Sequence, residues 1–393
     1  MSRILVVNSG SSSFKYQLLE LDGERRLASG LVERIGEAQG RLEHKVPGAE
    51  TIEVIAPVAD HTAGFALMVE AFAQHGPDLA AEPLLAVGHR VVQGGKRFFE
   101  PTVVSDLVEI NIEDLSELAP LHNPGAVQGI RAARAAFADV PHVAVFDTAF
   151  HQTIPEAAST YAIDLEIAER HRIRRYGFHG TSHKFVSEAA AAFLGEETFT
   201  GVVLHLGNGA SACAVRDGRS VDTSMGMTPL QGLVMGTRSG DIDPAVLIHL
   251  QRRAGLSVAE VDDLLNKRSG LLGLTGSGDM RDVRRRSNDG DADARRALDV
   301  YAHRLRHYLG AYLLELGTAQ AIVFTAGVGE NDAVLRAELL AGLEPFGIVV
   351  DPERNASPDR GARRISTDGS RVAVLVVPTD EELEIARQAA AVV

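Results

Sequence analysis

Three arginines of this chain lie in contexts that suit the binding of an anionic substrate. Arg90 ends an apolar run in GHRVVQGG, Arg238 lies between glycines in MGTRSGDIDP, and Arg281 lies between two aspartates in GDMRDV. A guanidinium group binds a carboxylate or a phosphate through paired hydrogen bonds. The sequence therefore predicts an anion site at these arginines. A structural ion pair with a nearby aspartate is the alternative for each, and it is strongest for Arg281.

Turns rich in glycine, serine and asparagine end several apolar segments. They are residues 8–13, 207–211, 276–278 and 327–331. Backbone N–H groups in such turns point at anions, and glycine lets the chain come close to them. Each turn alone reads as an ordinary hairpin, but the four together favour a phosphate cradle. Lys15, after the first turn, is either a phosphate ligand or an exposed strand lysine.

Two common nucleotide motifs do not explain these turns. The chain has no GxxxxGK followed by serine or threonine, which argues against a P-loop enzyme. Residues 207–212 match GxGxxA, but the residues that follow predict a strand where a dinucleotide fold needs a helix. The match therefore gives little support to NAD binding.

Histidine is plentiful, with 14 residues, but no spacing is typical of a zinc site. The run YGFHGTSH at residues 176–183 precedes a helix expected at residues 184–194, for which Thr181 or Ser182 is the expected cap. A histidine at a helix N-terminus, such as His179, lies where anions are favoured. A structural histidine is the alternative. The single cysteine, Cys213, is expected to be buried in a strand.

The elements that would position these residues repeat along the chain. Residues 4–23 and 202–218 share an apolar strand, a loop of small residues, a second strand and an Asp-Gly turn. Such repetition predicts two related α/β halves. Helices are expected at 62–75, 123–137, 244–254, 258–267, 292–316 and 382–391, with Asn123 as the cap and Pro124 as the first residue of the second. A loop is expected at 326–331, followed by another helix that ends at 343. Strands are expected at 83–92, 142–146, 321–325 and 372–377.

The composition limits the classes of partner. The chain has 393 residues and a net charge of -14, and nucleic acids or anionic membranes attract basic surfaces instead. No apolar run approaches the roughly 18 residues of a membrane span, and the N-terminus lacks the apolar core of a signal peptide. We expect no nucleic-acid or membrane partner and a cytoplasmic location.

Ten segments in order along the chain resemble the acetokinase family. They are VNSGSSSFKYQLL, GHRVVQGG, LAPLHNP, VAVFDTAFHQTIP, RRYGFHGTSHK, HLGNGAS, MGTRSGDIDP, RDVR, FTAGVGEN and PTDEELEIAR. The resemblance implies an α/β fold of the duplicated actin-like (ribonuclease H-like) type, with two lobes and a central cleft. The first lobe would comprise residues 1–149 and 382–393. The second, residues 150–381, would carry the nucleotide loops and the dimer interface.

The same resemblance implies reversible, Mg²⁺- or Mn²⁺-dependent transfer of the ATP γ-phosphate to acetate, with acetyl phosphate and ADP as products, by a homodimer. It assigns catalysis to Arg90, Asp147, His179 and Arg238. It assigns acetate binding to Arg90, Val92, Leu121, Phe178 and Pro229. Metal binding falls to Asn8 and Glu381, and nucleotide binding to Lys15, His205, Leu206, Gly207, Asn208, Gly209, Asp279, Met280, Arg281, Gly327, Val328, Gly329, Glu330 and Asn331.

Two motifs depart from the family pattern. Asp380 stands where the family usually has asparagine, which adds a negative charge beside the expected metal site. The turn before Asp279, GSGD, has fewer serines than the family usually shows. Transfer to propionate or another short-chain acid is the nearest alternative activity, and a sugar kinase or an actin-like ATPase is more distant.

Acetate has a pKa near that of Asp or Glu, about 4, and is already an anion at neutral pH. It therefore needs no general base. We accordingly expect Asp147 to orient an arginine or a metal-bound water, not to accept a proton.

Overall fold

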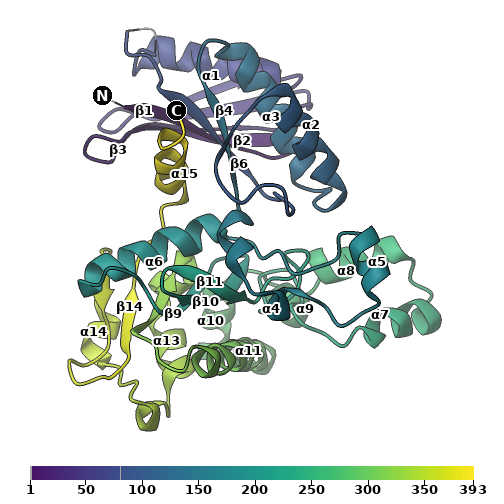
Figure 1. The fold of residues 1–393 in the computed structure, drawn as a ribbon, viewed down its shortest axis with the longest axis vertical. Coiled ribbons are helices and arrows are strands. Elements are labelled where there is room, and N and C mark those ends of the chain that lie inside the picture. Colours follow the sequence, from purple (N-terminus) through teal and green to yellow (C-terminus); the bar gives the residue numbers. More distant parts are fainter. Residues whose placement is uncertain (1, 80) are drawn as a thin grey trace. The chain divides into compact units, whose positions relative to one another are not determined.

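The computed structural model describes residues 2–79 and 81–393 (Figure 1). The chain divides into two compact units, which are described separately below. Unit 1 is Met1–Phe150 with Asp380–Val393, and unit 2 is His151–Thr379. The lobes expected from the sequence, residues 1–149 with 382–393 and residues 150–381, stay a prediction.

Unit 1 contains one mixed sheet in the order β5-β4-β3-β2-β1-β6-β8-β7. β1 pairs antiparallel with β2 and parallel with β6, which pairs parallel with β8. The strands are β1 (Arg3–Ser9), β2 (Ser13–Glu20), β3 (Arg25–Glu33), β4 (Gly40–Lys45), β5 (Ile52–Ala56), β6 (Ala86–Val91), β7 (Thr102–Val103) and β8 (His142–Phe146).

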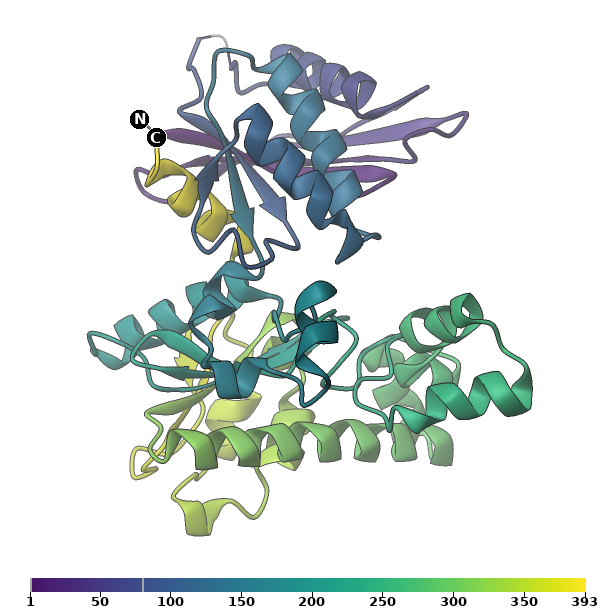
Figure 2. The same ribbon diagram turned by 45° about the vertical axis from the view of Figure 1, so that its right-hand side comes forward.

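Alternate residues of β1 pack on opposite faces of this sheet, as the two-residue period of a strand requires. Leu5 and Val7 join the core with α1 (His61–His75) and α3 (Asn123–Ala136). Ile4 and Val6 join a second core with the C-terminal helix α15 (Glu381–Ala390). Figure 2 shows the two groups of helices on either side of the strands. The remaining helical segments of the unit are α2 (Asp106–Asp114), η1 (Leu115–Glu117) and the start of η2 (Ala149–Thr153).

Unit 2 repeats the strand order. Its sheet runs β11-β10-β9-β12-β14-β13, with β9, β10 and β11 antiparallel and β9, β12 and β14 parallel. This matches β3-β2-β1-β6-β8 of unit 1 strand for strand, so the duplicated ribonuclease H-like, actin-like α/β fold is confirmed. The strands are β9 (Gly201–Leu206), β10 (Ala210–Arg216), β11 (Arg219–Thr223), β12 (Ala321–Thr325), β13 (Arg363–Arg364) and β14 (Ala373–Val376).

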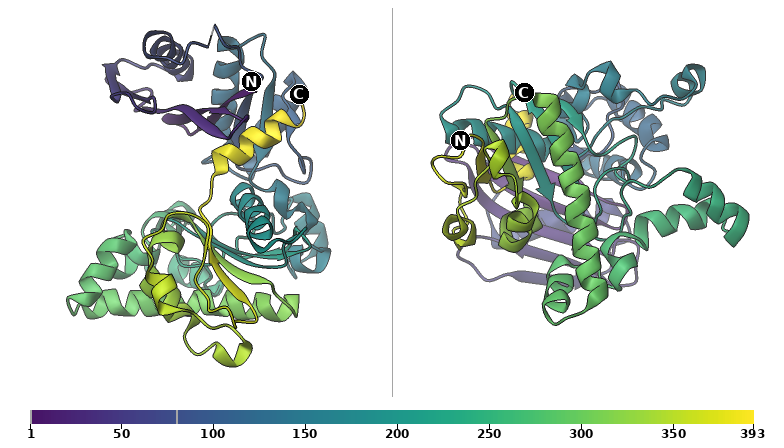
Figure 3. Two further views of the ribbon diagram at one scale, coloured as in Figure 1. Left: turned by 90° about the vertical axis from the view of Figure 1, so that its left-hand side faces the viewer. Right: turned by 90° about the horizontal axis from the view of Figure 1, so that it is seen from below.

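Two long helices cover this second sheet on opposite faces, as Figures 1 and 3 show: α6 (Gly180–Leu194) and α11 (Ala292–Leu316). α11 buries a residue every three or four positions, from Ala294 to Leu316, as an amphipathic helix does. The other helices are α4 (Glu156–Ser159), α5 (Leu165–Arg170), α7 (Ala245–His249), η3 (Leu250–Ala254), α8 (Val258–Lys267), α9 (Gly270–Thr275), α10 (Met280–Asn288), α12 (Ala326–Asn331), α13 (Ala333–Leu340), η4 (Glu344–Phe346) and α14 (Pro352–Ala356).

Three local expectations were wrong. The cap of α3 is His122, because the Asn123 side chain instead bonds Gln93 and Ile112. Helix α6 begins at Gly180, with Thr181 and Ser182 already inside its first turn and His179 as the N-cap. Residues 326–331 form the short helix α12 and not a loop. For Asn123, tertiary hydrogen bonds outweighed the local preference for a helix cap.

The expectation for Cys213 was met. Cys213 is buried in β10, and burial raises the pKa of its thiol above the usual range. Within residues 2–79 and 81–393, no helix is both long and apolar enough to span a bilayer.

Candidate active site

The carboxyl ends of three parallel strands of unit 1 bring polar residues to one face of the sheet. Asn8 is the next-to-last residue of β1, Arg90 is near the end of β6, and Asp147 directly follows β8. Strand register gives all three the parity of Ile4 and Val6, on the face covered by α15. Lys15 pairs with Asn8 across the β1–β2 hairpin and shares this face. A Cβ on Gly88 would lie 2.9 Å from the Ile385 side chain of α15, so a larger residue at this position would have to displace that side chain.

Arg90 and Asp147 form a forked ion pair. Arg90 Nε donates to the two carboxylate oxygens at 3.0 and 3.1 Å, and its terminal nitrogen donates at 2.7 Å. Asp147 is 1% exposed, and the Arg90 side chain is 24% exposed. The carboxylate raises the pKa of Arg90 above its usual range, so the guanidinium stays charged. Asp147 therefore fixes the direction in which Arg90 presents its remaining N–H groups.

Glu381, the first residue of α15, lies in a strongly acidic surrounding. Burial raises its pKa to about 7; Arg90 opposes this shift, and Asp147, Glu382 and Asp380 add to it. Asp380 caps α15 by accepting from Leu383 N–H at 2.9 Å, so the departure from the family's usual asparagine preserves a helix cap.

The oxygen donors of unit 1 fit a hard divalent cation. Within the described ranges no cluster of three or more His, Cys, Asp or Glu residues forms a metal cage. Mg²⁺ commonly takes only one or two protein oxygens and completes its shell with water and phosphate. Glu381 beside Asp147 offers carboxylate oxygens whose mutual repulsion a cation would relieve. The half-buried carboxamide of Asn8 adds a neutral oxygen on the same face.

In unit 2 the predicted residue His179 occupies an unusual backbone position at the start of α6. Its φ of 56° is left-handed, a conformation uncommon for a residue with a side chain. Its Nδ1 lies 3.0 Å from Ser211 Oγ, and its ring stacks on His205 with 4.3 Å between ring centres. A Cβ on Gly209 would lie 3.5 Å from His179 Nε2 and 3.2 Å from an Arg238 terminal nitrogen. His179 and Arg238 thus face one position beside the Gly209 loop.

Arg238 differs from Arg90 in its charge balance. Its side chain donates to the Pro229 carbonyl oxygen at 2.7 Å, and in the described parts of the chain it forms no ion pair with a carboxylate. Burial lowers the pKa of Arg238, since nothing nearby compensates its charge. A partly desolvated guanidinium of this kind favours the approach of an anion.

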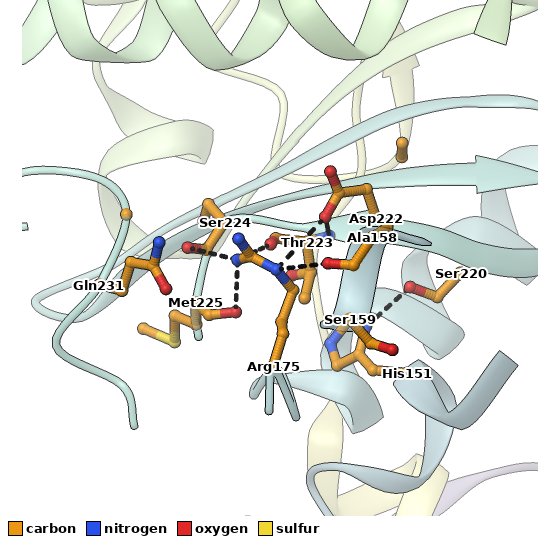
Figure 4. Close-up of polar contacts among 12 residues, drawn as sticks. His151, Ala158, Ser159, Arg175, Ser220, Asp222, Thr223, Ser224, Met225 and Gln231 are labelled. Atoms are coloured by element: carbon orange, nitrogen blue, oxygen red, sulfur yellow. Dashed lines mark hydrogen bonds and ion pairs between the residues drawn. The ribbon is translucent and has the colours of Figure 1, made fainter. Parts of the chain in front are cut away.

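The loop that carries Pro229 is held by a polar network (Figure 4). Arg175 donates to the carbonyl oxygens of Thr223, Ser224 and Met225 at 2.6, 3.3 and 3.1 Å, and to that of Ala158 at 3.2 Å. The Tyr161 hydroxyl donates to Gln231 at 2.6 Å and accepts from Met227 N–H at 3.0 Å. Sequence analysis did not identify Arg175 or Tyr161, because their partners are distant in the chain.

A pocket of about 990 Å³ lies in unit 2, large enough for a nucleotide. Eight predicted nucleotide residues line it: Gly207, Asn208, Asp279, Met280, Arg281, Gly327, Val328 and Asn331. Gly278, in the turn at 276–278 that was expected to bind phosphate, also lines it. Eight further lining residues were not predicted: Gly236, Leu271, Arg284, Tyr301, Asp332, Ala333, Val334 and Arg360. Gly236 and Arg284 lie within the segments MGTRSGDIDP and RDVR, but neither was expected to bind the nucleotide.

Six predicted nucleotide residues do not line this pocket: Lys15, His205, Leu206, Gly209, Gly329 and Glu330. Leu206 is fully buried in β9, and His205 bonds Ser182 Oγ through Nδ1 at 2.7 Å. Lys15, which is exposed, belongs to unit 1. His205 and Leu206 are thus held in the protein interior by their positions in β9.

The Arg281 side chain forms an ion pair with Asp279, two residues earlier in the chain. Its Nε and terminal nitrogen donate to the Asp279 carboxylate at 3.0 and 2.6 Å, and its side chain is 91% exposed. The structural ion pair, the alternative for Arg281, therefore forms. Asp279 also caps α10 by accepting from Arg281 N–H.

Besides Arg90, the four residues expected to bind acetate are divided between the units. Val92 and Leu121 lie in unit 1, where Leu121 is 63% exposed. Phe178 and Pro229 lie in unit 2, where Phe178 is buried. Neither unit alone brings the set together.

A family model, relatives in sequence and solved structures all relate this chain to short-chain acid kinases. The model of the acetokinase family matches residues 3–387. The acetate kinase of Leifsonia xyli subsp. xyli is 66% identical over 99% of this chain and 98% of its own length. Two solved structures each cover 100% of both chains at 39% identity: an acetate kinase from Porphyromonas gingivalis (TM-score 0.95) and a propionate kinase from Francisella tularensis subsp. tularensis (TM-score 0.94).

Proposed function

Because this chain belongs to the acetokinase family, we propose that it transfers the γ-phosphate of ATP to acetate, reversibly, giving acetyl phosphate and ADP. The observation that carries the proposal is the 66% identity, over essentially the full length, to a relative named acetate kinase. Two features agree with this proposal: Arg90 and Arg238, whose guanidinium groups suit anionic substrates, and the pocket of unit 2, which is large enough for a nucleotide.

The main barrier in this reaction is electrostatic. Acetate, a ready nucleophile at neutral pH, must approach the anionic γ-phosphate. Arg90, held by Asp147, presents N–H groups suited to the acetate carboxylate. Arg238 and His179 contact the phosphoryl group in transfer and stabilise its equatorial oxygens.

Asp147 orients Arg90 in this mechanism and accepts no proton. Both of its oxygens already accept hydrogen bonds from Arg90. Asn8 and Glu381 would hold Mg²⁺, or Mn²⁺, which when bound neutralises phosphate charge. Asn208, Gly327 and the other predicted residues of the pocket would hold ATP or ADP.

The proposed activity is tested with purified protein, ATP, MgCl₂ and acetate. We expect acetyl phosphate in the ³¹P NMR spectrum and ADP formation that requires acetate. The reverse reaction should make ATP from acetyl phosphate and ADP. ADP formation that is independent of acetate would indicate an ATPase, and dependence on glucose would indicate a sugar kinase; either result would overturn the proposal.

Propionate is the second candidate acceptor, because one of the two structures above is named a propionate kinase. One methylene group changes binding in an apolar pocket by only about 1 to 3 kcal/mol. Comparison of kcat/KM for acetate, propionate and butyrate decides between the acids. A homodimer and a cytoplasmic location are proposed from the family resemblance alone; analytical ultracentrifugation and cell fractionation test them.

A further inference from the structure

Ser211 bridges two histidines in the interior of unit 2. Its hydroxyl oxygen lies 2.7 Å from His183 Nε2 and 3.0 Å from His179 Nδ1. Ser211 and His183 are both fully buried. The bridge links β10 to the first turn of α6, next to the position that His179 and Arg238 face.

The protonation of His183 follows from its surroundings. Burial lowers its pKa well below the usual value, with His151 and His205 adding to the effect, so the ring is neutral. A neutral imidazole carries one N–H and one lone pair. Within the described ranges His183 Nδ1 has no hydrogen-bond partner. A buried N–H without an acceptor is rare in folded proteins, so the proton lies on Nε2 and is donated to Ser211 Oγ.

This donation determines the direction of the second hydrogen bond. A serine hydroxyl has one proton to give. Since Ser211 Oγ accepts from His183, it donates its own proton to His179 Nδ1. The His179 proton therefore lies on Nε2, the edge of the ring that faces the Gly209 loop and Arg238.

We propose that His183 and Ser211 are positioning residues that hold His179 as the neutral Nε2–H tautomer. His179 then stabilises the transferred phosphoryl group as a fixed hydrogen-bond donor, and not as a cation. The inference rests on the proposed function for the role of His179, but the tautomer itself does not. If His179 were an imidazolium, its Nδ1–H would also donate to Ser211 Oγ, which already accepts from His183. The serine proton would then lose His179 Nδ1 as its acceptor.

The first test needs no change to the bridge. Long-range ¹H–¹⁵N NMR spectra of the full chain labelled with ¹⁵N-histidine distinguish the two neutral tautomers and the imidazolium. The His179 signals are assigned by their absence from His179→Gln. We expect His179 to be protonated at Nε2 only, at pH 7.5. A proton on Nδ1 would overturn the proposal.

The second test is kinetic, with matched serine variants. Ser211→Ala removes the bridge, and we expect kcat with acetate to fall on the order of 10- to 100-fold while KM for ATP changes less than about twofold. Ser211→Thr keeps a hydroxyl and should recover most of the loss. Ser187→Ala is the control. Ser187 is an equally buried serine of α6 whose hydroxyl donates to Lys184 O, and in the described parts of the chain it has no hydrogen bond to His179 or His183, so the variant should retain the parent kcat.

Ser211→Ala with kcat within twofold of the parent would overturn the positioning role, as would an equal loss in Ser211→Ala and Ser187→Ala. A parent chain that phosphorylates no acid would overturn the proposed function instead. The NMR spectrum judges the tautomer independently of that result.

Discussion

At the scale of single residues, the two arginines of the proposed site differ in their need for an anion. Arg90 is neutralised by Asp147, whereas Arg238 is half-buried and, among the residues that the structure describes, donates a hydrogen bond to the Pro229 carbonyl oxygen and pairs with no carboxylate. An uncompensated guanidinium gains most when a phosphoryl group brings negative charge to it. We therefore assign the larger catalytic effect to Arg238.

Arg238→Ala should lower kcat by about 10³-fold or more, the range of an arginine that stabilises a phosphoryl transition state. ATP affinity, measured by calorimetry, and the circular dichroism spectrum should remain close to those of the parent. Arg268→Ala, which removes an exposed arginine paired with Asp263, is the control and should retain activity. Turnover of Arg238→Ala within tenfold of the parent would contradict the assignment.

A double-mutant cycle tests the role of Asp147. If Asp147 acts only by orienting Arg90, Asp147→Asn should lower kcat/KM for acetate, and the double variant with Arg90→Gln should be no worse than Arg90→Gln alone. If Asp147 is a general base, the two losses should multiply. Steady-state rates at several acetate concentrations distinguish these results.

At the scale of elements, close packing of three turns shapes the nucleotide pocket. Gly236 N–H donates to Asn208 O at 3.0 Å. A Cβ on Gly236 would lie 2.1 Å from Asn208 Oδ1 and 3.0 Å from Gly278 O. No side chain larger than a hydrogen atom fits at residue 236 while Asn208 keeps its place in the lining.

Gly236→Ala should therefore displace Asn208 and weaken ATP binding about tenfold, as overpacking costs about 1 to 3 kcal/mol. Gly310→Ala is the matched control. It lies in the exposed face of α11 with no atom within 4 Å of a new Cβ, and it should raise the melting temperature, since alanine favours a helix by about 1 kcal/mol over glycine. Calorimetric ATP titrations and melting curves check both; equal ATP affinity in all three proteins would contradict the packing argument.

At the scale of the whole molecule, buried neutral histidines make stability depend on pH. The pKa values of His44, His89, His142, His151 and His183 all lie below the usual value, with burial as the first cause. For His151 the pKa falls from 6.5 to about 4. Between pH 6.5 and about pH 4, the unfolded chain therefore binds more protons than the folded chain. Stability is thus complete above pH 6.5 and declines as the pH falls toward 4.

His151→Gln tests this linkage. At pH 7.5 it should melt below the parent, because His151 bonds Ser220 and the Phe178 carbonyl in the core. The difference should narrow as the pH falls from 6.5 to 4.5, by about 1 kcal/mol per pH unit for one proton. His249→Gln, at an exposed position, should leave the curve unchanged. A gap of constant size across this range would show that His151 does not contribute to the acid response.

Patterns between near neighbours predicted most of the fold. The repeat of strand, small-residue loop and strand indicated two related sheets, and the spacing of apolar residues marked α1, α11 and the central strands. The expected cap at Asn123 failed because its side chain bonds residues far away in the chain. Local propensities are weak beside such tertiary hydrogen bonds.

The sequence by itself determined the family, the duplicated fold, and the residue types available for anion and nucleotide binding, since these are carried by periodicity and short motifs. Only the tertiary structure decided which side chains meet: Arg90 with Asp147, Arg281 with Asp279, and His179 with Ser211 and His183. It also brought Arg284, Tyr301 and Arg360 to the pocket. Most of these contacts join residues that are distant in the chain, and their hydrogen-bond directions depend on burial and on shared partners, which no local pattern encodes.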